Sequence, residues 1–302
     1  MTRSVVRAFA LAAVLPVLAG GCAPGIQTRP VLSHKSDDPQ AELRIADSAL
    51  AGGNVDLAST LYEKVLAKHP ESLAARLGLG DVNYRAGDLE RARILYDEAQ
   101  RQAPAELGPR LGLARVALRQ RRLDEAAQRY RDLLAAQPNH PLAAEGLGTV
   151  LDLQGRHADA QVVYRDALRV HPDAQGLRVD LGLSLVLSNR PREGVNVLLD
   201  VAGLPSAPWQ ARQNLAFAYG VLGNTDSAKK LLSADLPASA VADNLRFYQA
   251  VRARLASRGG GAGGSSAAPP MSGAALEPGV APPMSGAALE PGVAPPDAGA
   301  AK

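Results

Sequence analysis

The sequence predicts an all-α protein of about six stacked pairs of antiparallel helices, closed by a further helix at the C-terminal end. Three series of residues that recur every 34 positions support this prediction. The first series consists of prolines: Pro70, Pro104, Pro138 and Pro172. The second consists of small residues: Ala58, Ala92, Ala126, Ala160, Gly194 and Ala228. The third consists of tyrosine or leucine: Tyr62, Tyr96, Tyr130, Tyr164, Leu198 and Leu232.

The spacing within this period is diagnostic. A small residue, a bulky residue four positions later and a proline eight positions after that are typical of the tetratricopeptide repeat. Such repeats stack into a right-handed superhelix, which offers an extended surface to protein partners and no closed chemical pocket. The period therefore favours a non-catalytic binding scaffold over an enzyme, and we expect no metal, cofactor, small-molecule substrate or nucleic acid.

The repeats follow one another without a gap inside a domain that we expect to span 39–258. They cover 39–72, 73–106, 107–140, 141–174, 175–208 and 209–242. Glycines lie between the two helices of four repeats, where a left-handed backbone costs glycine little; these are Gly53, Gly87, Gly155 and Gly223. The fifth repeat is the most divergent, since its proline has moved to Pro205. A final helix at about 238–257 has an apolar stripe and is predicted to cap the last repeat.

The N-terminal 21 residues are typical of an export signal. Arg3 and Arg7 provide the positive end, and 8–18 is an apolar core too short to span a bilayer. The small residues 19–21 then precede Cys22, the single cysteine of the chain. This arrangement resembles the bacterial lipobox, in which the cysteine is acylated and becomes the new N-terminus, although Ala19 stands where leucine is preferred.

Lipidation at Cys22 predicts a protein anchored in the outer membrane and facing the periplasm, because Ala23 lacks the aspartate that usually marks inner-membrane retention in such lipoproteins. The alternative is ordinary signal cleavage, which would leave an unpaired thiol in an oxidising compartment. Residues 22–38 are then a flexible tether between the anchor and the repeats. Removal of Arg3 and Arg7 with the signal lowers the formal net charge from +3 to +1, so the high isoelectric point is no argument for nucleic acid.

The C-terminal segment 259–302 changes composition abruptly to glycine, proline and alanine. The stretch APPMSGAALEPGV occurs in it twice, at 268–280 and 281–293. A segment of this composition cannot bury a core, so we expect it to be disordered. It is either an extension without function or an extended arm that threads the cell wall or docks a partner.

The first helices of such repeats line the concave face of the superhelix. The candidate partner-binding residues on these helices are Asp81, Tyr84, Arg85, Arg115, Arg119, Glu145, Asp152, Leu183, Gln213 and Phe217. The predicted groove is polar and partly basic in its first half and apolar in its second. It either grips a partner segment through carboxylates that meet the arginines, or consists of solvated arginines beside an apolar stretch that the C-terminal helix covers. The five histidines form no Ser/His/Asp or Cys/His set with supporting context.

The stretch 175–250 resembles a narrower family. The pieces DLGLSLVLSNR, RQNLAFAYGVLG and DLPASAVADNLRFY are similar to the tetratricopeptide lipoprotein of the tight-adherence (Flp) pilus assembly system. The resemblance implies an outer-membrane-anchored, pilotin-like helper that assists assembly or placement of the secretin ring. Its partners would be the secretin or other pilus-assembly components. Periodicity alone indicates only a scaffold, and the alternative is an exported repeat scaffold of another envelope system, such as cellulose secretion or cell-wall assembly.

Overall fold

The computed structural model describes residues 38–259 of the 302-residue chain. The predicted signal at 1–21, the tether up to residue 37 with Cys22, and the tail after residue 259 lie outside the described residues.

The described part is all-α, which confirms the predicted fold class. It contains thirteen helices: α1 (Pro39–Ala51), α2 (Val55–Lys68), α3 (Leu73–Ala86), α4 (Leu89–Gln102), α5 (Leu107–Arg119), α6 (Leu123–Ala136), α7 (Pro141–Leu153), α8 (His157–Val170), α9 (Gln175–Leu187), α10 (Pro191–Ala202), α11 (Trp209–Leu222), α12 (Thr225–Leu232) and α13 (Ala238–Gly259). Odd-numbered helices up to α11 are the first helices of the six repeats, and even-numbered helices are the second.

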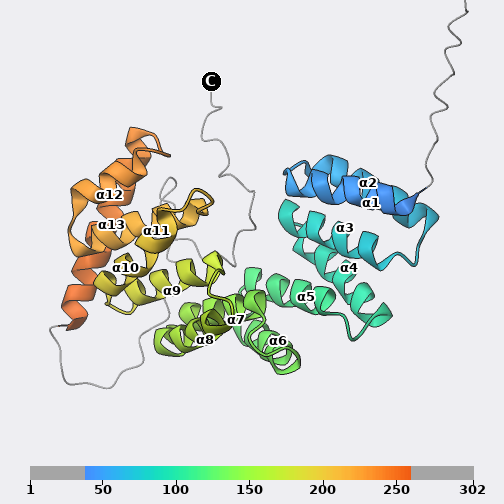
Figure 1. Cartoon of the computed structure of the whole chain (residues 1–302), viewed down its shortest axis with the longest axis horizontal. Helices are drawn as coiled ribbons and strands as arrows, with labels where there is room; N and C mark the ends of the chain where they lie inside the picture. The colour runs from blue at the N-terminus through green and yellow to red at the C-terminus, as the bar shows by residue number, and fades with distance from the viewer. Residues whose placement is uncertain (1–37, 260–302) are drawn as a thin grey trace, which may run out of the picture. The chain divides into compact units, whose positions relative to one another are not determined.

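Consecutive helices pack side by side along the whole described range (Figure 1). Each first helix contacts its own second helix and also the second helix of the preceding repeat. Further contacts join first helices of neighbouring repeats, such as α7 with α9. Helix α13 departs from this order, since it packs against both α11 and α12. The apolar core is therefore a series of linked clusters along the stack.

In every repeat, one residue of the turn between the two helices has a left-handed backbone conformation, always at the same repeat position. Gly53, Gly87, Gly155 and Gly223 have φ between 76° and 89°, as the sequence predicted. Arg121 and Asn189 occupy the same position in the third and fifth repeats and have φ of 61° and 62°. Asparagine tolerates this region and arginine does so rarely, so the turn geometry here is imposed by the two flanking helices.

Tyrosine rings of the second helices fill spaces left by glycines of the first helices. Tyr62 and Tyr130 lie against Gly78 and Gly146 of the following repeats, and Tyr96 lies against Gly112 of the following repeat. A Cβ atom on any of these glycines would overlap the facing ring. All of these tyrosines are about 1% exposed, so each ring closes a junction between two repeats.

The last two repeats pack differently from the first four. Leu198 replaces the tyrosine and packs on Gly182, while α12 is only eight residues long. Helix α13 packs against α11, and its residues Val241, Tyr248 and Val251 are buried there. The predicted capping helix is thus present. No helix within residues 38–259 combines the length and apolarity that crossing a bilayer requires.

The fit of Tyr130 on Gly146 predicts a large effect for a single methyl group. Gly146→Ala should lower the free energy of unfolding by about 1–3 kcal/mol, because the added Cβ atom must displace a ring that has no free space around it. Urea unfolding followed by circular dichroism measures this change.

Gly108→Ala is the matched control for that variant. Gly108 also lies in a first helix, but an added Cβ atom there would meet only the mobile end of Leu77, at 3.3 Å. Its stability should be unchanged or slightly higher, because alanine favours helix over glycine. Equal effects of the two variants would contradict the assignment of the ring to the junction.

Candidate partner-binding surface

The candidate surface is the row of first-helix side chains of the second and third repeats, and it centres on Tyr84. The guanidinium groups of Arg115 and Arg119 lie 4.3 Å and 5.0 Å from the centre of the Tyr84 ring. A cation this close to an aromatic ring is attracted by the ring's π electrons. Helix α5 thus places two of the predicted arginines beside one tyrosine ring of α3.

Asp81 joins the same cluster from α3. Arg115 donates to the Asp81 carboxylate across 3.5 Å, and the Tyr96 hydroxyl donates to the same Oδ1 atom at 2.5 Å. The Arg115 side chain is 16% exposed, whereas that of Asp81 is 41% exposed. The Tyr96 hydroxyl of α4 therefore positions the Asp81 carboxylate, which stays partly exposed to solvent.

Two arginines also link consecutive repeats through the main chain. Arg85 donates to the carbonyl of Leu50 at 2.7 Å, and Arg119 donates to the carbonyl of Tyr84, 34 residues further along. The two contacts are equivalent in the repeat. Arg119 remains exposed and Arg85 is half-buried, so these side chains both join repeats and contribute positive charge to the surface.

Asp47 is an equivalent of Asp81 that the sequence reasoning missed. The Tyr62 hydroxyl donates to Asp47 at 2.5 Å, as Tyr96 does to Asp81. The signal was available, because Asp47 and Asp81 are 34 residues apart, each 15 residues before its tyrosine. The same repeat position thus carries Asp47 and Asp81 in the first two repeats and Arg115 in the third.

Glu145 and Asp152 lie in α7, and both side chains are largely buried. Glu145 is 8% exposed and its carboxylate lies beside Gly176 at the start of α9. The side chain of Asp152 is 12% exposed. Its oxygen atoms accept from Ser184 at 2.7 Å and Tyr164 at 3.1 Å and lie 2.7 Å from Nδ1 of His157.

The structure thus brings together a serine, a histidine and an aspartate that the sequence did not connect. Their arrangement does not suit nucleophilic catalysis. The Ser184 hydroxyl donates to the carboxylate of Asp152, whereas a nucleophile requires the histidine as its base. Ser184 is also fully buried and cannot meet a substrate. The network instead joins α7, α8 and α9 through hydrogen bonds.

The apolar half of the predicted groove is covered. Phe217 is 1% exposed and packs between Phe247 and Tyr248 of α13, with ring centres 6.3 Å and 5.2 Å away. Leu183 is 7% exposed and belongs to the same buried cluster, whereas Gln213 is half-buried. Phe217 is therefore covered by α13, and Leu183 is buried in the same cluster. Tyr84 is also buried, at 6% exposed. Partner contact by all ten residues stays a prediction.

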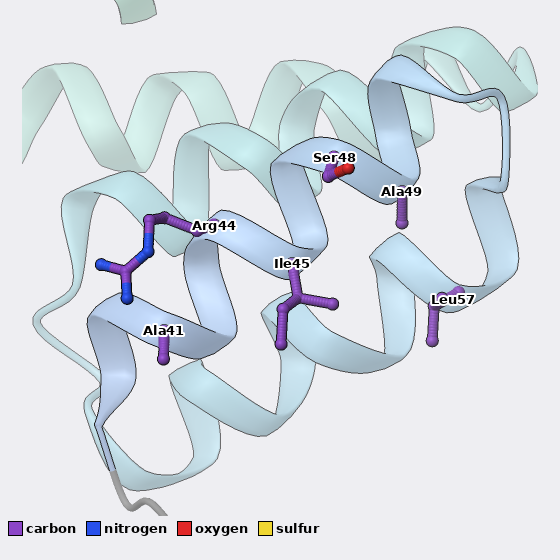
Figure 2. Close-up of a pocket in the computed structure, with 6 residues that line it drawn as sticks. All are labelled: Ala41, Arg44, Ile45, Ser48, Ala49 and Leu57. Carbon is purple, nitrogen blue, oxygen red and sulfur yellow. The ribbon is translucent and has the colours of Figure 1, made fainter.

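Within residues 38–259, no cluster of histidine, cysteine, aspartate or glutamate side chains is arranged as metal ligands would be. An open, apolar hollow lies on α1 and α2, outside the Tyr84 cluster (Figure 2).

Comparison with known proteins agrees with the repeat register. A family model described as tetratricopeptide repeat matches residues 43–106 and 111–174. The chain folds as a tetratricopeptide-repeat protein. This fold is typical of non-catalytic scaffolds that bind protein partners. No sequence among curated proteins matches the chain.

Solved tetratricopeptide-repeat structures share the fold at low sequence identity. A repeat protein from Parabacteroides merdae is 16% identical with a TM-score of 0.54, over 73% of this chain and 90% of that one. Pseudomonas aeruginosa pilF is 19% identical with a TM-score of 0.54, over 72% and 97% of the two chains. A chain of the APC/C hetero-tetramer Cut9-Hcn1 is 16% identical with a TM-score of 0.61, over 72% and 42%. At these identities the likeness concerns the fold alone.

The buried tyrosines predict an alkaline limit to stability. Burial raises the pKa of Tyr96, Tyr130 and Tyr164 well above the ordinary value of 10.0, and nearby carboxylates add to the rise for Tyr96 and Tyr164. Because the folded state holds these protons more tightly, stability is fully present below about pH 10 and falls as the pH rises further. The loss should approach about 1.4 kcal/mol per pH unit for each such tyrosine.

Urea midpoints between pH 8 and pH 11 measure this loss. Tyr130→Phe removes one of the titrating groups and should make the decline shallower above pH 10. The measurement at pH 8 is the internal control, since Tyr96, Tyr130 and Tyr164 are neutral there in both states. A decline that is equally steep in the variant would show that the alkaline loss has another origin.

Proposed function

We propose that the protein is a non-catalytic scaffold of tight-adherence (Flp) pilus assembly. In this proposal it is anchored in the outer membrane through a lipid on Cys22, faces the periplasm and acts in a pilotin-like way toward the secretin. The repeat fold supports the scaffold part. The resemblance of 175–250 to the lipoprotein of that system supports the pilus part, and the lipobox around Cys22 supports the anchor.

The observation that carries the binding mode is the stacking of Arg115 and Arg119 on Tyr84. A guanidinium group carries five N–H donors in a planar fork whose geometry matches a carboxylate. Because the stacking fixes these side chains in advance, a carboxylate can bind them with little loss of conformational entropy. We therefore infer that the partner presents an acidic segment to helices α3 and α5.

The anchor is tested with Cys22→Ser. Acyl chains supply most of the membrane affinity of a lipoprotein, so this variant should move from the outer-membrane fraction to the soluble periplasmic fraction. Immunoblots of separated fractions measure the change, and a known outer-membrane protein is the loading control. Unchanged fractionation of the variant would rule out a lipid at Cys22 as the anchor.

The binding surface is tested with the double variant Arg115→Glu/Arg119→Glu. Replacing two positive charges by two negative ones places like charges against an acidic partner, so affinity for the purified periplasmic part of the secretin should fall about tenfold or more. Surface pili, counted by electron microscopy, should fall with it. Circular dichroism and a urea midpoint show whether the repeats remain folded.

Arg101→Glu/Arg169→Glu is the matched control, with the same change of charge on second helices. These two side chains are 70% and 76% exposed, and each pairs with an acidic residue of its own helix. The control should bind and assemble pili normally. If both double variants bind normally, the Tyr84 cluster is not the binding surface. If neither they nor deletion of the protein alters pilus display, the protein serves another envelope system.

A further inference from the structure

Charged side chains follow a fixed order along the first helices α1, α3 and α5. The charges lie at two repeat positions, four residues apart in each helix. These positions are occupied by Asp47 and Ala51 in α1, by Asp81 and Arg85 in α3, and by Arg115 and Arg119 in α5. The row therefore runs from a single carboxylate in α1, through one charge of each sign in α3, to two guanidinium groups in α5.

The other charged side chains of these three helices are engaged elsewhere. Three of them contact the second helix of their own repeat: Glu42 with Lys64 at 2.6 Å, Arg76 with Glu98 at 3.5 Å, and Arg110 with the carbonyl of Asp132 at 3.0 Å. Arg44 lies 3.9 Å from Asp38 and lines the hollow on α1 and α2 (Figure 2). The order of charges along the row is therefore set by the two repeat positions.

The row is continuous from one helix to the next. Arg115 of α5 donates to Asp81 of α3 at 3.5 Å. The Tyr62 hydroxyl donates to Asp47 of α1 at 2.5 Å and lies close to the charges of α3 as well. Burial and the carboxylates of Asp47 and Asp81 raise the pKa of Tyr62, whereas Arg85 lowers it. Groups from α1 and α3 thus surround one hydroxyl, and α5 joins them through Asp81.

Both ends of the row are open to solvent. Asp47 is exposed, and its Oδ1 atom accepts from the Tyr62 hydroxyl. Arg119 is exposed at the other end, whereas the side chain of Arg115 is only 16% exposed. A partner can therefore reach a carboxylate at α1 and a guanidinium group at α5.

The distance between the two ends sets the length of a matching segment. First helices of neighbouring repeats contact each other, and packed helices lie about 8–10 Å apart, so α1 and α5 are about 16–20 Å apart. A polyproline II segment has about three residues per turn and rises about 3.1 Å per residue. Its side chains six positions apart thus lie on one face at a distance of about 19 Å.

We propose that the partner segment carries charges of both signs: an acidic residue that meets Arg119 and, about six positions away, a basic residue that meets Asp47. This inference rests on the binding surface of the proposed function and adds the class of segment that the surface selects. The order of charges also fixes the orientation of the segment, because the opposite placement brings like charges together at both ends.

Labelled proline-rich peptides test the proposal with the full chain. The bipolar peptide carries one lysine and one glutamate six residues apart, and the comparison peptide has alanine in place of the lysine. Because an exposed ion pair contributes modestly, the bipolar peptide should bind about fivefold more tightly at low ionic strength. Fluorescence anisotropy measures the two affinities.

Substitutions of Asp47 make the result specific. Asp47→Asn keeps an acceptor for the Tyr62 hydroxyl but removes the charge, so this variant should bind both peptides equally. Asp47→Lys should reverse the preference, because the lysine of the bipolar peptide then meets a like charge. Asp200→Lys is the matched control at an exposed aspartate of α10, and it should keep the fivefold difference. Urea midpoints show whether each variant remains folded.

The outcomes separate this proposal from the proposed function. Equal binding of the two peptides by the unchanged chain, binding of neither, or an undiminished difference in Asp47→Asn would overturn the bipolar segment. If the secretin fragment binds despite such a result, the proposed function stands without it. A fivefold difference that depends on Asp47, in a chain that does not bind the secretin fragment, would support the bipolar segment and reject the secretin as the partner.

Discussion

The seating of an aromatic ring on a glycine of the next repeat is the contact on which the stack depends. Tyr62, Tyr96 and Tyr130 each close one junction in this way, and their hydroxyl-bearing edges reach toward the first-helix face. The glycine lets two helices approach closely, and the ring fills the space that the missing side chain leaves. Burial of the ring, orientation of Asp47 and Asp81, and the position of the arginines above them all follow from this packing.

The fold was predictable because its information is local and periodic. The 34-residue spacing identifies the helices, and glycine at a fixed position identifies four of the six turns. The left-handed conformation of Arg121 was not predictable from residue type, since only the register of the flanking helices shows that the turn must be the same. Local preference yields there to the packing of the two helices.

The candidate surface was predictable only in part. Repeat register placed Arg85, Arg115 and Arg119 on first helices, but it could not show that Tyr84 stacks with two of them. It also left open whether the C-terminal helix covers Phe217, because the course of α13 over α11 is a long-range contact. The buried network around Asp152 was missed for a related reason. Ser184 lies 32 residues from Asp152, so the two meet only when repeats stack.

The acceptors that Arg85 and Arg119 use are main-chain carbonyls, and these exist in every repeat whatever its sequence. Leu153, Leu187 and Val221 occupy the same repeat position in the last three repeats. Leu153 and Leu187 are half-buried, so one substitution at either would supply a new arginine with a ready-made acceptor, whereas Val221 is buried in the core. The charge pattern along this face can therefore change one repeat at a time in the fourth and fifth repeats.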